Sequence, residues 1–273
     1  MSDGSLGNQF YRVIDNARGA LFDQGELAQL SYGAFDTAAA TMNNMAQETI
    51  EITFPIGWRA DKQPINSTRK YNKQQLLHRY QFLAFHQLAV NGLVQLVTIV
   101  EAMLGDIVRA VILKYPQKLG SKRTISLESV LEAASLEDMH LRALDSLLNE
   151  LSYKSPKDFA ESVNELLSIN LLECPAFHRY IEVKASRDVF IHNRGIANDV
   201  YVRKAGSHVR VRSGMALPAD TVYFLESYEY CLQFCEWLEE QLHNKWHSSD
   251  FEAQRKRQLE MKLPGGGGSN VGA

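Results

Sequence analysis

One stretch of the chain, SRDVFIHNRG from Ser186 to Gly195, contains side chains that can carry out chemistry. Arg187 lies five residues before His192, and Asp188 follows the arginine directly. Histidine transfers protons near neutral pH, and arginine donates paired hydrogen bonds to phosphate oxygens. On a helix, Asp188 and His192 are four residues apart and share a face, so the carboxylate can orient the imidazole. These residue types indicate acid–base chemistry at a phosphate.

Two neighbouring residues extend this group. Arg194 follows Arg187 by seven residues, about two helical turns, and is a second candidate for phosphate binding. Asn193 can hold a phosphate oxygen or the histidine. In the alternative interpretation, His192 and Asn193 cap the helix and Arg187 makes an intrachain salt bridge. On an ideal helix Arg187 and His192 lie about 140° apart, so one helix does not easily direct both at the same phosphate.

The composition is that of an ordinary globular protein with one large domain, or one domain and an appendage. Apolar residues make up 45% and charged residues 22% of the 273 residues, and the net charge is −3. The segment from Arg179 to Arg212 holds eight Lys and Arg residues against three Asp and Glu residues, which gives +5 there and −8 elsewhere. A local basic surface favours an anionic ligand at one place, although a solvated helix face followed by a charged loop would have the same charge.

The sequence has none of the usual patterns of secretion, membrane insertion or metal binding. Its three cysteines have no histidine or cysteine partners at zinc-ligand spacing, so we expect core thiols. The most apolar segment, residues 88–104, is interrupted by Asn91, Gln95 and Glu101. We therefore expect a cytoplasmic protein that needs no membrane, metal or cofactor.

Apolar residues at helical spacing predict a mostly helical chain. In the first half we expect one or two helices over residues 8–51, a loop over residues 52–71 because of its Pro and Gly residues, and a long helix over residues 72–115 that ends before Pro116. A short helix is expected over residues 126–134.

The second half is expected to contain four longer helices. They cover residues 136–152, 156–168, 175–193 and about 221–246, and the second and third of them begin at a proline. Gly195 is the expected terminating residue of the third. Residues 200–214 alternate and turn, which predicts a small hairpin or an irregular excursion. Residues 251–273 are charged and then Gly-rich, which predicts a disordered tail.

In this setting the motif resembles the signature of the HEPN superfamily, compact α-helical domains that often act as metal-independent ribonucleases. The resemblance lies in the R-x4-H pattern of Arg187 and His192, continued by Asn193 and Gly195, and in the order of the expected helices from Tyr71 to about Trp246. It implies an all-α, HEPN-like helical bundle with an N-terminal helical arm and a small hairpin excursion before the last helix. The corresponding division is an arm and linker at 1–70, the domain at 71–250 and the tail at 251–273.

The resemblance also implies a site. Many members have an acidic residue in the first core helix, and Glu101 lies at the corresponding place, so we expect it to form a buried pair with Arg187. His192 would then be the general acid and base, Arg187 would stabilise the phosphate, and Asp188 and Asn193 would support them. RNA would be bound by four basic residues: Lys184, Arg194, Arg203 and Lys204.

We thus expect a metal-independent endoribonuclease that cleaves RNA through its ribose 2′-hydroxyl, in a toxin or phage-defence setting. Members of the superfamily commonly dimerise with two signatures facing each other, which predicts a homodimer or a larger assembly, with a regulatory partner protein as a further expectation. The alternative is a catalytically silent HEPN-like module that binds nucleotide or organises a complex.

Overall fold

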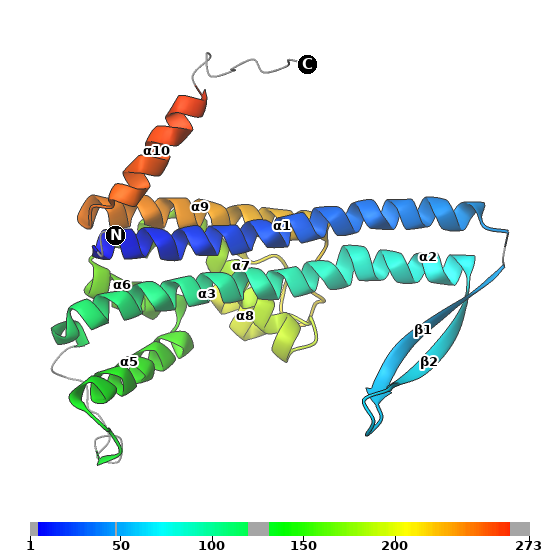
Figure 1. Ribbon diagram of the computed structural model, residues 1–273, viewed down its shortest axis with the longest axis horizontal. Helices are drawn as coiled ribbons and strands as arrows, with labels where there is room; N and C mark the ends of the chain where they lie inside the picture. Colours follow the sequence, from blue (N-terminus) through cyan, green and yellow to red (C-terminus); the bar gives the residue numbers. More distant parts are fainter. Residues whose placement is uncertain (1–4, 47, 120–130, 263–273) are drawn as a thin grey trace.

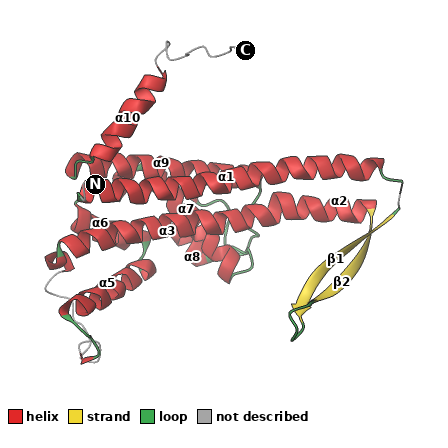
Figure 2. Ribbon diagram, in the orientation of Figure 1, coloured by secondary structure: helices red, strands yellow, loops and turns green. Residues whose placement is uncertain are grey.

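A computed structural model of the chain describes residues 5–46, 48–119 and 131–262. This part of the chain is helical apart from one two-stranded hairpin (Figure 2), so the expected all-α class is confirmed. The longer elements are α1 (Leu6–Asn44), β1 (Thr49–Trp58), β2 (Pro64–Asn72), α2 (Lys73–Phe82), α3 (Leu88–Lys114), α5 (Leu136–Tyr153), α6 (Pro156–Leu167), α7 (Pro175–His192), α8 (Asp199–Ala205), α9 (Thr221–Lys245) and α10 (Ser249–Lys262).

The core of the molecule lies between α1, α3, α7 and α9, which pack against one another along their lengths (Figure 1). In the first half of α1, Phe10, Ile14 and Leu21 are fully buried in the same cluster as residues of α3 and α9. The expected boundary at residue 70 therefore does not separate an arm from the domain. The far end of α1, together with α2 and the hairpin, extends beyond the bundle at one end, and α10 projects from the other (Figure 1). Buried positions become sparser toward the end of α1.

The long helix expected over residues 72–115 is present as α2 and α3, joined by a π-helical turn, η1 (Leu83–Gln87). Asn72 caps its start and exchanges hydrogen bonds with Gln75 in a capping box. Gly92 allows α9 to approach α3 closely, because a Cβ atom there would lie 2.4 Å from the ring of Phe224. The helix is thus fixed at its start by local sequence and in its middle by packing.

The loop expected over residues 52–71 is wrong: β1 and β2 pair there as an antiparallel hairpin. Proline and glycine led to the loop prediction, yet the pairing shifts register between Pro55 and Gly57, where a bulge accommodates both. Across the strands, Thr53 and Thr68 share a hydrogen bond of 2.8 Å between their hydroxyl groups. The β-branched residues of β1, which include Ile50, Ile52 and Thr53, outweigh the turn-forming residues in this segment.

The helices that carry and flank the motif follow the sequence closely. Ser155 caps α6 and Pro175 opens α7, as expected. α7 ends at His192, and the turn that follows places both Arg194 and Gly195 at positive φ. The short helix expected over residues 126–134 lies largely outside the described residues.

Two expectations near the C-terminus are corrected. Residues 200–214 form the short helix α8 and a 3₁₀ turn, η4 (Gly206–His208), in place of a hairpin, because Asn198 caps α8 and Tyr201 is buried against α7. The charged part of the expected disordered tail forms α10, whose start is held by Asn8: its side-chain oxygen accepts a 3.2 Å hydrogen bond from the backbone of Asp250. The Gly-rich segment from residue 263 lies outside the described residues.

Candidate functional site

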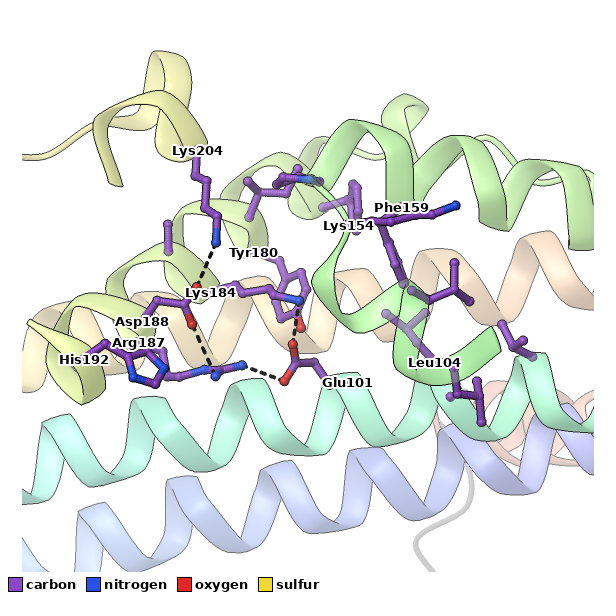
Figure 3. A pocket seen from close by; sticks show the side chains of 18 residues that line it. Glu101, Leu104, Lys154, Phe159, Tyr180, Lys184, Arg187, Asp188, His192 and Lys204 are labelled. Carbon is purple, nitrogen blue, oxygen red and sulfur yellow. Dashed lines mark hydrogen bonds and ion pairs between the residues drawn. The ribbon is translucent and has the colours of Figure 1, made fainter. Parts of the chain in front are cut away.

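The motif helix forms one wall of a cavity of about 500 Å³, which is also lined by α3, α5, α6 and α8 (Figure 3). One end of the cavity is charged and the other is apolar. Of the predicted site residues, six line the cavity: Glu101, Lys184, Arg187, Asp188, His192 and Lys204. The structure thus brings together, from three different helices, most of the residues that the sequence singled out.

The charged end consists of five side chains in alternating order, which we call the ion-pair chain. Glu101 accepts contacts from Lys184 (Nζ to Oε1) and Arg187 (Nη2 to Oε2), both at 2.6 Å. Asp188 lies 3.2 Å from Nη1 of Arg187 and 3.0 Å from Nζ of Lys204. Arg187 pairs with Glu101 as predicted, but the Glu101 side chain is 35% exposed, so the pair is only partly buried. Three cations and two carboxylates leave this chain with one excess positive charge, and it ties α3, α7 and α8 together.

The structure does not place Asp188 in its expected role beside His192. The carboxylate of Asp188 is engaged by Arg187 and Lys204 (Figure 3), and α8, the source of the lysine, was not expected as a helix. His192 is the last residue of α7 and is exposed at the cavity. Among the described residues it has no hydrogen-bond partner, so its ring is open to a ligand or to solvent.

Arg187 and His192 line the same cavity of a single chain. Their separation around the helix is overcome because the arginine side chain is long and the histidine stands at the helix end, next to the turn. A second chain is therefore not needed to bring the two groups to one cavity. The homodimer stays a prediction.

Three other predicted residues lie outside the cavity lining. Asn193 donates a hydrogen bond from its side chain to the carbonyl of Ile196, so it stabilises the turn after α7, as in the capping alternative. Arg194 is exposed in a left-handed backbone conformation, and Arg203 is exposed on α8. These two arginines belong to the surface around the cavity.

A buried carboxylate that was not among the predicted site residues supports the helices that carry the site. Glu182 is 5% exposed and accepts hydrogen bonds from Ser186 at 2.6 Å, Tyr201 at 2.9 Å and Tyr223 at 2.8 Å. Burial, followed by the charge of Glu182, raises the pKa of Tyr201 to about 12. The network joins α7 to α8 and α9, and it thereby positions Lys204 one turn after Tyr201.

This network had only a faint signal in the sequence. Glu182 and Ser186 are four residues apart and can meet on one helix, but the two tyrosines come from 19 and 41 residues away. Nothing local specifies that pairing. It depends on how α8 and α9 pack against α7.

Within the described ranges, one group of side chains is close enough to share a metal ion: His243, His247 and Glu252, with ligand atoms within 4.8 Å of one another. This group was not predicted from the sequence. The backbone N–H of Ser248 donates to Nδ1 of His243, so a neutral ring has its proton on Nε2, the atom that faces Glu252. A nitrogen that carries a proton has no free lone pair for a metal ion, so this form of His243 does not bind metal through Nε2. The three residues also lie away from the cavity lining.

Comparison of the chain with protein-family models, with curated proteins and with solved structures found no match. None of the helices in residues 5–46, 48–119 and 131–262 has the length and apolar character needed to cross a membrane.

Proposed function

We propose that the protein is a HEPN-like endoribonuclease that cleaves RNA without a metal ion. The observation that carries the proposal is the position of His192, which is exposed at the same cavity as Lys184, Arg187 and Lys204 and has no partner in the described part of the chain. A proton-transfer group beside clustered cations suits reaction at a phosphodiester. The toxin or phage-defence setting rests on the family resemblance alone. A cytoplasmic location and a regulatory partner protein are further parts of the proposal.

In the proposed reaction, His192 takes the proton from a ribose 2′-hydroxyl, and the oxygen attacks the adjacent phosphorus. The bond from phosphorus to the 5′-oxygen breaks, and the leaving oxygen takes up a proton. The products are a 2′,3′-cyclic phosphate and a 5′-hydroxyl. The excess positive charge of the ion-pair chain stabilises the dianionic transition state. Lys184 and Lys204 can also donate hydrogen bonds to it, because each ammonium group has three N–H donors and its carboxylate partner does not use all of them.

The surface around the cavity supports binding of the RNA backbone. Arg194 is exposed in the turn after α7 and Arg203 is exposed on α8, both within the segment that carries +5. Contacts of this kind are independent of base sequence and weaken as salt rises. They would hold the RNA strand while the scissile phosphate lies at His192.

The test is incubation of purified protein with total RNA in EDTA. We expect cleavage with cyclic-phosphate ends, and a loss of about 10²- to 10⁴-fold in rate for His192→Ala. His78→Ala is the matched control, because His78 is exposed on α2 and does not line the cavity. Full activity of a folded His192→Ala variant, or a requirement for added magnesium, would overturn the proposal.

A second candidate function is a catalytically silent, nucleotide-binding or scaffolding module. It is favoured by the two carboxylates that already engage Arg187, which reduce the charge available to a reacting phosphate. The same assay separates the two functions, because a silent module would bind RNA or nucleotide and leave the RNA intact.

The proposed homodimer has its own test. Mixtures of His192→Ala and Arg187→Ala chains regain activity only if an active site takes groups from both chains. Activity in the mixture above that of either parent would establish a shared site. Because both residues line one cavity of a single chain, inactive mixtures would place a complete site in each chain.

A further inference from the structure

The cavity is larger than a phosphate site requires, and its second end has a different character. Leucine, valine, isoleucine and phenylalanine side chains from α3, α5, α6 and α7 line that end: Leu104, Val108, Leu148, Leu151, Phe159 and Ile181. A volume of about 500 Å³ lies within the range of roughly 300–1,000 Å³ found for small-molecule sites. The proposed RNA cleavage makes no use of this apolar end.

Two residues that line the cavity each carry a buried hydrogen-bond donor with no partner among the described residues. The donors are the hydroxyl of Tyr180, a residue only 3% exposed, and Nε of Arg187. Burial, and next the charge of Glu101, raises the pKa of Tyr180 well above its ordinary value, so its hydroxyl stays protonated and can donate. A buried donor without an acceptor costs free energy, and a ligand oxygen would remove that cost.

The charges on the lining indicate the sign of such a ligand. Lys154 lies at the cavity together with the three cations of the ion-pair chain, and these four cations contact three carboxylates, Glu101, Asp188 and Glu150, which leaves one excess positive charge. Lys154 itself contacts Glu150 at 3.0 Å and Ser162 at 2.8 Å, so it is held in place beside the apolar end. An anionic head group is therefore favoured at the charged end of the cavity.

We propose that this cavity binds an amphipathic organic anion, with a carboxylate or phosphate head on the ion-pair chain and Tyr180, and an aliphatic body at the apolar end. An aliphatic body fits better than a nucleobase, because no asparagine or glutamine of the described residues lines the cavity to read the edge of a base. The inference goes beyond RNA cleavage and does not depend on it, since binding is measured without RNA.

Gly105 offers a way to fill the cavity without disturbing the fold. It lines the cavity from α3, and a Cβ atom added there meets no atom within 4 Å. Leucine also favours a helix over glycine by roughly 0.5–1 kcal/mol, so Gly105→Leu should fold. Gly33→Leu is the matched control, because Gly33 is an exposed helical glycine on α1 whose added Cβ atom also meets nothing.

Titration calorimetry with decanoate and with decyl phosphate tests the proposal on the full chain, and the tighter of the two identifies the head group. We expect one binding site in the wild-type protein and in Gly33→Leu, and affinity at least about tenfold weaker in Gly105→Leu. Decyltrimethylammonium, which has the same tail and the opposite charge, should not bind. If Gly105→Leu fails to fold, Leu148→Trp replaces it. Three results would overturn the proposal: no binding of either anion, anion binding by Gly105→Leu (or its replacement) as tight as by the wild-type protein, or binding of decyltrimethylammonium as tight as of the anions.

Discussion

Replacement of Arg187 by alanine separates the structural from the chemical role of the motif arginine. The variant removes the contacts to Glu101 and Asp188 at 2.6 and 3.2 Å. Each carboxylate nevertheless keeps a lysine, Lys184 at 2.6 Å and Lys204 at 3.0 Å. No buried charge is left alone, which limits the expected loss of stability.

The size of that loss follows from exposure. The side chain of Arg187 is 17% exposed and that of Glu101 is 35% exposed, so the pair lies between the surface and the interior. Exposed pairs contribute about 0.2–1 kcal/mol, whereas loss of one partner of a buried pair costs about 3–5 kcal/mol. With the remaining lysines as partners, we expect the free energy of unfolding to fall by about 1–2 kcal/mol. The RNA cleavage rate should fall far more, by about 10²- to 10³-fold, because the transition-state charge loses a donor.

Urea denaturation and RNA cleavage in EDTA measure the two effects on the same preparation. Arg109→Ala is the control, since Arg109 on α3 makes an exposed pair with Asp145 at 3.1 Å and does not line the cavity. It should lose less than about 1 kcal/mol and keep full activity. Cleavage by Arg187→Ala within a few-fold of the wild-type rate would remove the arginine from the mechanism. A stability loss above about 4 kcal/mol would show that Arg187 acts as a buried structural charge.

Two further predictions concern buried titratable groups. Glu239→Ala should lower the free energy of unfolding by about 3 kcal/mol, because it removes the 2.6 Å partner of Arg18, which is 14% exposed and then keeps only Asp15 at 3.9 Å. The Arg18→Met/Glu239→Met double variant should recover most of this loss in urea denaturation. Equal losses in both variants would contradict this. Tyr201, with a pKa of about 12, keeps its proton between pH 10 and 12 while an unfolded tyrosine loses its proton, so stability should fall as the pH rises through that range. Thermal denaturation should show this slope, and it should be smaller in Tyr201→Phe; a slope unchanged by the substitution would refute the assignment.

Local sequence determined much of this protein. Ser155 and Pro156 specify the start of α6, Asn72 caps α2, and apolar residues at helical spacing produce the long α3. These features act within one or two turns, so they can be identified in the sequence. The same local rules failed for β1 and β2, where a bulge accommodated the Pro and Gly residues, and for α8, whose alternating valines resembled a strand.

The candidate site was determined only in part by the sequence. The motif supplied Arg187 and His192, and the apolar surroundings of Glu101 suggested the pair that joins α3 to α7. The partner of Asp188, the buried network of Glu182 and the apolar end of the cavity all depend on side chains that meet across helices far apart in the chain. Such contacts are selected by the packing of the whole bundle, because charge satisfaction and apolar burial act through space and leave no fixed spacing in the sequence.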